Sequence, residues 1–376
     1  MSEHARLAPS SAHIWTACPG SIVMQERYPE TEESPDARDG TAAHWYVAEV
    51  LSGREPGPVA PNGVPITAEM VDCAQGLLVD VRDTLAAHPG ASLRIETRVH
   101  MPIVNADNWG TPDVVMIDHD RRFVAVWDYK FGHRFVSPAR NLQLCDYAVG
   151  ALQEIALCRD WPAWTVSLNI AQPRNYDASG PIREWQTNGR VLLDEIVPQL
   201  FEAGKLALGD DPPTQTGEHC RDCTARHACQ TLHRAGALAM DVAGQVEPVD
   251  LPPAAVGLEL RQIDDAIKRL EARKSGLEQV ALGMIRSGRP VAFYGAEHTT
   301  GRERWTVPAA EVFALADMFE VGGVRKEPEA ITPNQTRALF QKAGVDPAVI
   351  SAYAERPRGA LRLTRVDDSA AKLAFE

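Results

Sequence analysis

The 376-residue sequence has no apolar run near the ~20 residues that a membrane-spanning helix needs. Its start also lacks a basic segment followed by an apolar one, so we expect no leader peptide, no membrane partner and a cytoplasmic protein. Internal repeats and low-complexity tracts are missing too. With 44% hydrophobic and 24% charged residues, the composition excludes fibrous and largely disordered chains and indicates a globular protein.

An excess of basic residues is also missing. The 38 Lys and Arg residues face 51 Asp and Glu residues, a net charge of −13, which excludes a surface coated for non-specific nucleic-acid binding. The deficit is uneven, because residues 1–245 carry 20 basic and 32 acidic side chains whereas residues 246–376 carry 18 and 19. Any bound phosphate backbone must therefore meet a local cleft, bound cations or the C-terminal third.

The length exceeds one ordinary domain and fits two, which we place at residues 1–245 and 246–376. Hydrophobic periodicity changes between 3.6 and 2 along the first part, which predicts an α/β or α+β domain containing a strand meander. Helices are expected over residues 41–51, 70–85, 141–157 and 191–208, and strands over 93–99, 114–117, 123–127 and 164–170.

The second part is predicted to be a smaller module that binds DNA or a partner. Apolar residues at alternating spacings of three and four over 260–284 predict a long helix. With fewer than four clean heptads, packing on its own protein is favoured over an intermolecular coiled coil. A hairpin is expected over 291–305, and the capping box at Thr332-Pro333 predicts a helix to about Ala343.

One carboxylate and one ammonium share a face at the end of a strand. Residues two apart in a strand point the same way, so Asp128 and Lys130 project together, and the apolar run 124–127 before them predicts a buried central strand. Lys130 is one of only two lysines in the first 245 residues, the other being Lys205. Taken alone, the pair also fits a simple ion pair at a strand end.

Further polar residues surround this pair in the expected fold. Asp113 follows the Gly-Thr-Pro turn of the preceding strand, opposite Asp128, and Glu96 on the strand before is a third candidate carboxylate. Facing carboxylates repel unless a cation such as Mg²⁺ lies between them. Gln143 and Tyr147 share a helix face, and His44 is expected in the first turn of a helix that begins near Gly40.

The ordered set Gly-x3-His, Gly-x-x-Asp, Asp-x-Lys and Gln-x3-Tyr resembles the RecB-type branch of the PD-(D/E)xK nucleases, over residues 13–229. The resemblance implies a restriction-endonuclease-like core, in which a mixed central sheet is flanked by helices. Relatives often have Glu where this chain has Asp128. The implied roles are metal ligation of Mg²⁺ or Mn²⁺ by His44, Asp113 and Asp128, water orientation or activation by Lys130, and support of the site or the DNA strand by Gln143 and Tyr147.

This resemblance implies a metal-dependent DNA exonuclease in phage or prophage recombination or DNA end processing. DNA is the expected partner, and a single-strand annealing recombination protein is a further candidate. The sequence leaves open whether the chain forms an oligomer. The C-terminal module is also similar to that of a phage-associated nuclease family. The alternatives are a structure-specific endonuclease and a DNA-end-binding scaffold with a weak nuclease site, although no metal ligand is lost from the motif.

Three of the seven cysteines, Cys220, Cys223 and Cys229, lie within ten residues in a polar segment, and Cys18 before Pro19 is the candidate fourth ligand. The arrangement resembles the iron-sulfur clasp of AddB-type nucleases and of CRISPR-associated RecB-like nucleases, which implies a 4Fe-4S cluster. The alternatives are a structural Zn²⁺, with His219 or His227 as a further ligand, and buried thiols. The remaining cysteines, Cys73, Cys145 and Cys158, are expected in the core.

Overall fold

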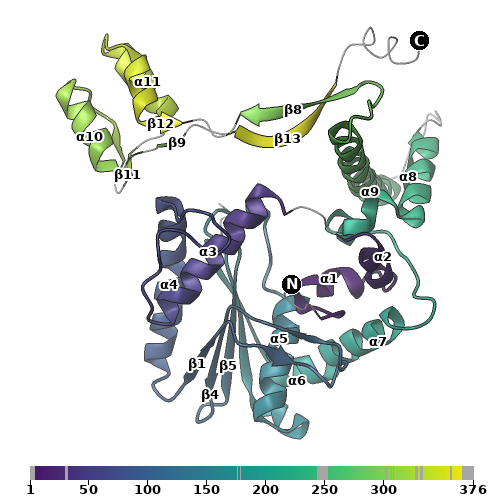
Figure 1. The fold of residues 1–376 in the computed structure, drawn as a ribbon. Coiled ribbons are helices and arrows are strands. Elements are labelled where there is room, and N and C mark those ends of the chain that lie inside the picture. Colours follow the sequence, from purple (N-terminus) through teal and green to yellow (C-terminus); the bar gives the residue numbers. More distant parts are fainter. Residues whose placement is uncertain are drawn as a thin grey trace. The chain divides into compact units, whose positions relative to one another are not determined.

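The chain folds into two compact units, Met1–Leu277 and Glu278–Glu376, each described here by itself (Figure 1). The structure is a computed structural model that describes residues 5–29, 33–175, 177, 179–243, 253–300, 304–305, 307, 309–326, 329–330, 333–355 and 358–365. In that part of the chain, no helix is long and apolar enough to cross a membrane.

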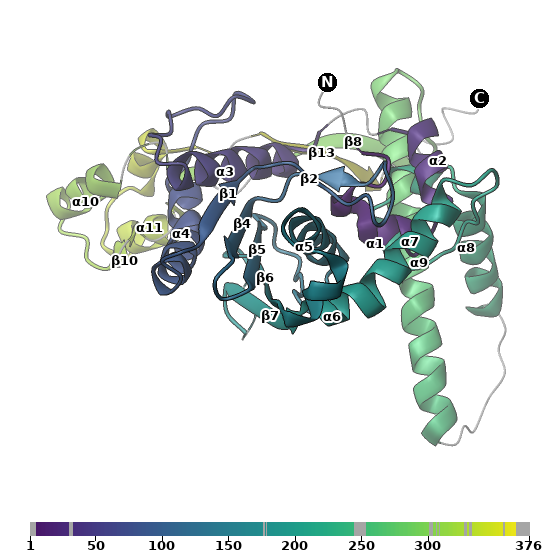
Figure 2. The same cartoon turned by 90° about the horizontal axis from the view of Figure 1, so that it is seen from below.

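A five-stranded mixed sheet with strand order β1-β4-β5-β6-β7 forms the centre of the first unit (Figure 2). Its strands are β1 (Ser92–Ile95), β4 (Val114–Asp118), β5 (Phe123–Tyr129), β6 (Thr165–Ala171) and β7 (Ile182–Asn188). Only β5 and β6 pair in parallel; the other neighbours are antiparallel. The short strands β2 (Val99–His100) and β3 (Trp109–Gly110) pair separately. The predicted α/β class and the β1-β4-β5 meander are therefore confirmed.

Helices cover both faces of this sheet (Figure 2). On one face, α3 (Pro35–Leu51) and α4 (Ala68–Ala87) share a core with Ala125 and Trp127 of β5. On the other face, α5 (Leu142–Ile155) and α7 (Val197–Ala207) share a core with Val124 and Val126. Because β5 is buried on both faces, the predicted central strand is confirmed.

Further helical elements, most of them short, belong to the first unit. They are η1 (Pro9–Ser11), α1 (Ala12–Trp15), α2 (Ser21–Arg27), η2 (Cys158–Ala163), α6 (Gly189–Val191), the π-helical turn η3 (Leu192–Ile196), η4 (Glu218–Arg221), η5 (Thr224–His227) and α8 (Gln230–Ala243).

The predicted start of α3 is wrong. The helix begins at Pro35, where the Ser34 hydroxyl accepts a hydrogen bond from the N–H of Ala37, and Gly40 lies inside it. A serine cap followed by proline at the first helical position is a stronger start signal than Gly-Thr. His44 therefore lies deep inside the helix, not in its first turn. At the start of α4, the Thr67 hydroxyl accepts a 3.2 Å hydrogen bond from the N–H of Met70.

The strand expected over 93–99 is interrupted at Glu96, whose φ of 45° lies in the left-handed region. The chain therefore ends β1 at Ile95 and resumes as β2 at Val99. Strand β7 was not predicted. It is an edge strand with a largely polar sequence, so it carries no apolar pattern to find.

The long helix is α9 (Pro253–Arg286), and the unit boundary lies inside it instead of at residue 245. Ala272 is buried against Cys220 and Leu232, which ties the first part of α9 to the cysteine segment. Leu270 also faces Gly236 of α8, where an added Cβ would lie 3.7 Å from its Cδ2 atom. The helix thus packs on its own chain along part of the apolar pattern predicted over residues 260–284. Other apolar residues of this pattern are exposed, namely Leu260, Ile263, Ile267 and Leu277.

In the second unit, α10 (Ala309–Met318), α11 (Pro333–Lys342) and η6 (Pro347–Ala352) share a small core around Phe340. The helix predicted from the capping box is confirmed as α11, while Thr332 itself lies outside the described residues.

The hairpin expected over 291–305 is wrong. Strand β8 (Tyr294–Thr300) pairs with β13 (Arg358–Arg365), and β9 (Arg304–Trp305) pairs with β12 (Ala354–Glu355). Only β10 (Arg325–Lys326) and β11 (Glu329–Ala330) pair locally among the described strands of this unit. Each long-range partner lies far along the chain, which a local pattern cannot reveal.

Candidate functional site

The end of β5 carries two of the predicted site residues. Asp128 is 3% exposed within the strand, and Lys130 directly follows it. The backbone N–H of Lys130 donates a 2.8 Å hydrogen bond to the carbonyl of Ala171, which extends the pairing of β5 with β6. The sheet therefore fixes the backbone from which both charged side chains project.

Asp128, Lys130 and Gln143 form a closed triangle of contacts. The Lys130 Nζ lies 2.8 Å from Asp128 Oδ2, and it donates a 3.1 Å hydrogen bond to Gln143 Oε1. Gln143 in turn donates a 2.8 Å hydrogen bond from Nε2 to Asp128 Oδ1. Because α5 begins at Leu142, the first turn of this helix presents Gln143 to the strand end.

One turn later on α5, Tyr147 is 4% exposed and packs tightly against Gly110. A Cβ on Gly110 would come 2.9 Å from the Cε1 atom of Tyr147, closer than two carbon atoms pack. The first residue of the Gly-x-x-Asp motif therefore has a steric reason to be glycine. Burial and the nearby charge of Asp128 raise the pKa of the Tyr147 phenol, so it stays neutral.

A second group lies beside the triangle. The Nδ1 atom of His44 is 3.0 Å from Asp113 Oδ1, and the N–H of Tyr129 donates a 2.6 Å hydrogen bond to Asp113 Oδ2. Glu96 completes the group, because one ligand atom each from His44, Glu96 and Asp113 lies within 4.8 Å of the others. The pairing of Val114 with Trp127 places Asp113 next to Asp128, as predicted.

The charges in this region strongly influence one another. Burial and the charge of Asp113 raise the pKa of Glu96 to about 7. Burial lowers the pKa of His44, but the charge and hydrogen bond of Asp113 outweigh this effect and raise it to about 9. Burial raises the pKa of Asp128, whereas Lys130 keeps a raised pKa because Asp128 opposes the cost of its burial. The Lys130 side chain is therefore a cation at neutral pH.

All six predicted site residues come together in the structure. The close group of possible metal ligands contains Glu96, His44 and Asp113, while Asp128 is held by Lys130 and Gln143. Imidazole and carboxylate groups suit a divalent ion such as Mn²⁺, and carboxylates alone suit Mg²⁺. The donor set thus fits a divalent cation.

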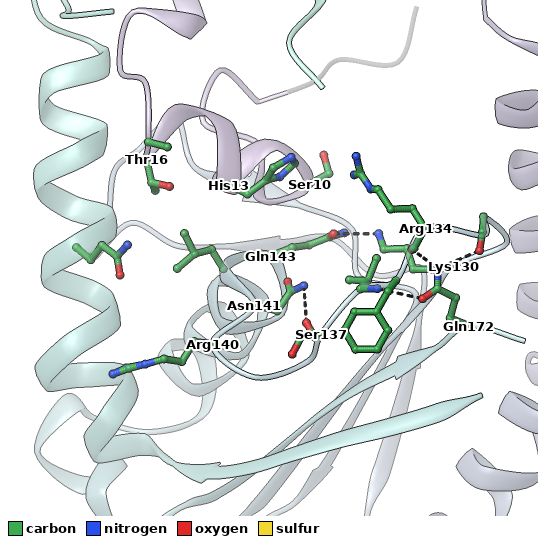
Figure 3. Close-up of a pocket in the computed structure, with 16 residues that line it drawn as sticks. Ser10, His13, Thr16, Lys130, Arg134, Ser137, Arg140, Asn141, Gln143 and Gln172 are labelled. Atoms are coloured by element: carbon green, nitrogen blue, oxygen red, sulfur yellow. Dashed lines mark hydrogen bonds between the residues drawn. The ribbon is translucent and has the colours of Figure 1, made fainter. Parts of the chain in front are cut away.

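A cavity of ≈ 810 Å³ opens beside Lys130 and Gln143 (Figure 3). Besides Lys130, its basic lining residues are His13 from α1, and Arg134 and Arg140 from the loop between β5 and α5. Among the described residues that line it, none is acidic. Basic groups therefore gather on the wall of this cavity, and the carboxylates that pair with Lys130, Arg134 and Arg140 are not among the lining residues.

No sequence motif marks these cavity residues. Two arginines in the ten residues after Lys130 were the available signal. Nothing local indicated that His13 lies on the same cavity, because the fold alone brings α1 to this loop.

The four predicted cluster cysteines, Cys18, Cys220, Cys223 and Cys229, line one small cavity. No three of their sulfur atoms all lie within 4.8 Å of one another. Within the described part of the chain, His44, Glu96 and Asp113 form the one group of three or more His, Cys, Asp or Glu residues with ligand atoms inside 4.8 Å of each other. Cys145 lies in the main core, as predicted.

Close backbone contacts bring Cys18 to the distant cysteine segment. The N–H of Gln215 donates to the Cys18 sulfur over 3.4 Å, and the N–H of Gly20 donates to the carbonyl of Pro213 over 2.9 Å. A Cβ on Gly20 would lie 2.8 Å from the carbonyl oxygen of Pro212, so only glycine allows this approach. Burial raises the pKa of Cys18, and that of Cys223 to about 11.

Asp222 connects the cysteine segment with the cavity beside Lys130. It accepts hydrogen bonds of 2.8 and 3.0 Å from Arg134, and its carboxylate lies 3.3 Å from the His13 ring. Burial opposes ionisation of Asp222, but the hydrogen bonds from His13 and Arg134 hold its pKa below the ordinary range. A residue between two cysteines thus positions two residues of the cavity.

Residues 4–371 match the family described as Protein of unknown function (DUF2800). The chain belongs to this family. The DUF2800 match covers both compact units, every residue of the candidate site and the four cysteines. The chemistry of this DUF2800 member therefore has to be inferred from the geometry of its site.

Proposed function

We propose that this chain is a Mg²⁺- or Mn²⁺-dependent deoxyribonuclease with a PD-(D/E)xK site of the RecB type. The observation that supports it most is the meeting of two groups at one end of the sheet. One is the group of His44, Glu96 and Asp113, and the other is the pair of Asp128 and Lys130. Crowded carboxylates beside a fixed ammonium suit phosphodiester hydrolysis, in which negative charge grows on the phosphate.

In this proposal, His44, Asp113 and Asp128 hold the metal ion, and Glu96 is close enough to His44 and Asp113 to contribute. A bound divalent ion supplies stabilisation of negative charge and an acidified water. Lys130 remains protonated, so it orients the water or stabilises the phosphate as a cation and does not serve as a base.

The other two residues act on these groups. Gln143 holds both Asp128 and Lys130, which fixes the distance between the ammonium and the carboxylate. Tyr147 is neutral and packed against Gly110, so it supports the first turn of α5. We assign both residues to positioning.

The proposed activity is exonucleolytic and serves phage or prophage recombination or DNA end processing, with DNA and a single-strand annealing protein as partners. End-labelled linear DNA and circular DNA, each incubated with Mg²⁺ or Mn²⁺, test this. An exonuclease degrades the linear DNA from its ends and leaves the circle intact. Cutting of the circle would indicate an endonuclease, and binding without cleavage would indicate a scaffold.

Variants of the site link any cleavage to this chain. Asp113→Ala, Asp128→Ala and Lys130→Ala should each lower the cleavage rate by about 100-fold or more, because each removes a metal ligand or the fixed cation. Lys205→Ala is the matched control, since Lys205 on α7 is the other lysine of the first 245 residues. Full activity in any of the three site variants would contradict the site assignment.

The four cysteines are proposed to hold a 4Fe-4S cluster, with a structural Zn²⁺ as the alternative. Their convergence on one cavity from residues 18 and 220–229 supports a shared ligand. Bound metal stabilises thiolates, which would offset the raised pKa of these buried thiols. Iron, sulfide and zinc analysis of anaerobically purified protein separates the two, since only the cluster is brown.

A further inference from the structure

Phe135 exposes an aromatic ring beside the proposed catalytic residues. It lies in the loop between β5 and α5, is 48% exposed and lines the cavity that Lys130 also lines. We propose that this cavity binds an unpaired DNA strand, in which a base stacks on Phe135 and the surrounding cations contact phosphates. This inference rests on the proposed nuclease function and names the form of substrate that the site takes.

The Phe135 ring is held in place before any ligand binds. The guanidinium carbon of Arg183 lies 4.6 Å from the ring centroid, so a cation stacks on the ring. Arg183 is itself fixed by hydrogen bonds to the carbonyls of Gly180 and Val136, both 3.0 Å, and to Gln172. A rigid platform loses little conformational entropy when a base stacks on it.

The backbone on both sides of Phe135 is fixed as well. Gln172, 1% exposed, donates hydrogen bonds of 2.9 and 2.5 Å to the carbonyls of Gly132 and Arg134. Its Oε1 atom accepts a 3.1 Å hydrogen bond from the N–H of Val136. One buried side chain therefore organises the loop that presents Phe135 and Arg134.

The charge around Phe135 suits a phosphate backbone. The cations Lys130, Arg134 and Arg140 line the cavity, and Asp128, which contacts Lys130, is not among the described lining residues. Arg134 is paired with Asp222 and Arg140 with Glu195, but each pair occupies only the two terminal nitrogens of a guanidinium with five N–H donors. These pairs orient the arginines and leave donors for phosphate oxygens.

The size of the cavity favours a single strand. At ≈ 810 Å³ it has the volume of a small-molecule site, which suits a short stretch of single strand better than a duplex. Aromatic side chains in a positive groove are the usual means of holding unpaired strands. A duplex would have to open, or end in an overhang, to reach Lys130.

The first test measures binding of a short fluorescent single strand in Ca²⁺, which supports binding without cleavage. Phe135→Leu should weaken the affinity by about 5- to 100-fold, and Phe135→Trp should retain it, because stacking needs a ring. Phe201→Leu is the control, since Phe201 on α7 is 45% exposed and is not among the lining residues. Blunt duplex should compete poorly with the single strand.

A second variant tests the phosphate contacts. Arg140→Gln should make the salt dependence of strand affinity shallower by about one phosphate contact. The control is Arg159→Gln, because Arg159 is 80% exposed and lies outside the cavity lining. Circular dichroism of each variant confirms that the fold is intact.

Equal strand affinity for Phe135→Leu and the unaltered protein would overturn the inference, as would equal competition by blunt duplex. The two proposals fail separately. Phe135-dependent strand binding without cleavage in Mg²⁺ or Mn²⁺ would refute the nuclease and retain the strand site. Cleavage together with a strand affinity that does not depend on Phe135 would refute the strand site and retain the nuclease.

Discussion

Gln143 joins the two charged side chains at the end of β5, because its amide nitrogen donates to Asp128 and its amide oxygen accepts from Lys130. A neutral amide offers both a donor and an acceptor, so it holds a carboxylate and an ammonium together without adding charge. Its position in the first turn of α5 makes the geometry of the pair depend on where that helix begins.

We expect Gln143→Ala to lower the rate of DNA cleavage by about 10- to 100-fold, since supporting residues of metal sites have effects of this size. Asp128 and Lys130 remain in this variant but lose their common partner. Gln75→Ala is the control, because Gln75 lies exposed on α4. The positioning role is refuted if Gln143→Ala cleaves at the full rate while Lys130→Ala is inactive.

The strands and helices around this site could largely be predicted because their signals are local. The alternation around Asp128 and Lys130 showed a shared face, and the four-residue spacing of Gln143 and Tyr147 showed a shared helix side. Both relations depend only on the geometry of one element. The structure agrees with them for that reason.

Contacts between distant segments could not be predicted from such patterns. The Arg134–Asp222 pair joins residues 88 positions apart, and the Phe135 platform depends on Arg183 of β7. The turn at Glu96 has a left-handed φ. A glycine at this position would have indicated such a turn, whereas a glutamate does not. Polar side chains leave no periodic mark, so only the fold reveals these partners.

The buried carboxyl group of Asp146 should make stability depend on pH. Burial raises its pKa to about 8, although Asn108 donates hydrogen bonds of 3.1 and 3.0 Å to its two oxygens. The pKa of this carboxyl group is higher in the folded chain than in the unfolded chain, where it is near 4. Its contribution to stability is therefore fully present below about pH 4, where the group is protonated in both states. This stability should be lost as the pH rises to about 8, by up to about 1.4 kcal/mol per pH unit.

The variant Asp146→Asn should lack this loss, because the amide does not ionise. Urea unfolding between pH 4 and pH 9 should therefore show a variant of similar stability at the acid end and of greater stability at the alkaline end. Asp160→Asn is the control, because the Asp160 side chain is 57% exposed. Parallel pH profiles for Asp146→Asn and the unaltered protein would contradict the assigned shift.

Loss of Cys18 should release the proposed cluster. Cys18 joins the cavity of Cys220, Cys223 and Cys229 across about 200 residues, so its loss frees a long loop. On the scale for cross-links, Cys18→Ala should lower the free energy of unfolding by several kcal/mol and remove bound metal. The measurements are metal content and urea unfolding.

Cys145→Ala serves as the control, because Cys145 is also fully buried but lies in the main core and does not line the cavity of the four cysteines. It should retain metal and lose only the stability that a small cavity costs, about 1 kcal/mol. Equal metal content in Cys18→Ala and the unaltered protein would exclude Cys18 as a ligand. The catalytic proposal would remain, since the cysteines lie outside the site of Asp113, Asp128 and Lys130.

Two glycines of α9 should respond oppositely to the same substitution. A Cβ on Gly276 would lie 2.8 Å from the Cα and N atoms of His227, so Gly276→Ala should push the helix away from the cysteine segment. The overpacking should lower the free energy of unfolding by about 1–3 kcal/mol. Gly283, seven residues further along, has no neighbour within 4 Å of its added Cβ. Gly283→Ala should therefore stabilise the helix by up to ~1 kcal/mol, because alanine favours it.

The sign of the difference between these two variants tests whether α9 truly lies against the His227 backbone. If it does, Gly276→Ala should also reduce metal content, since Cys223 and Cys229 lie on either side of the displaced backbone at Arg226 and His227. Urea unfolding and metal analysis of both variants measure the two effects independently. Stabilisation by both substitutions would mean that α9 does not pack on this segment in solution, and the close approach of Ala272 to Cys220 would be refuted with it.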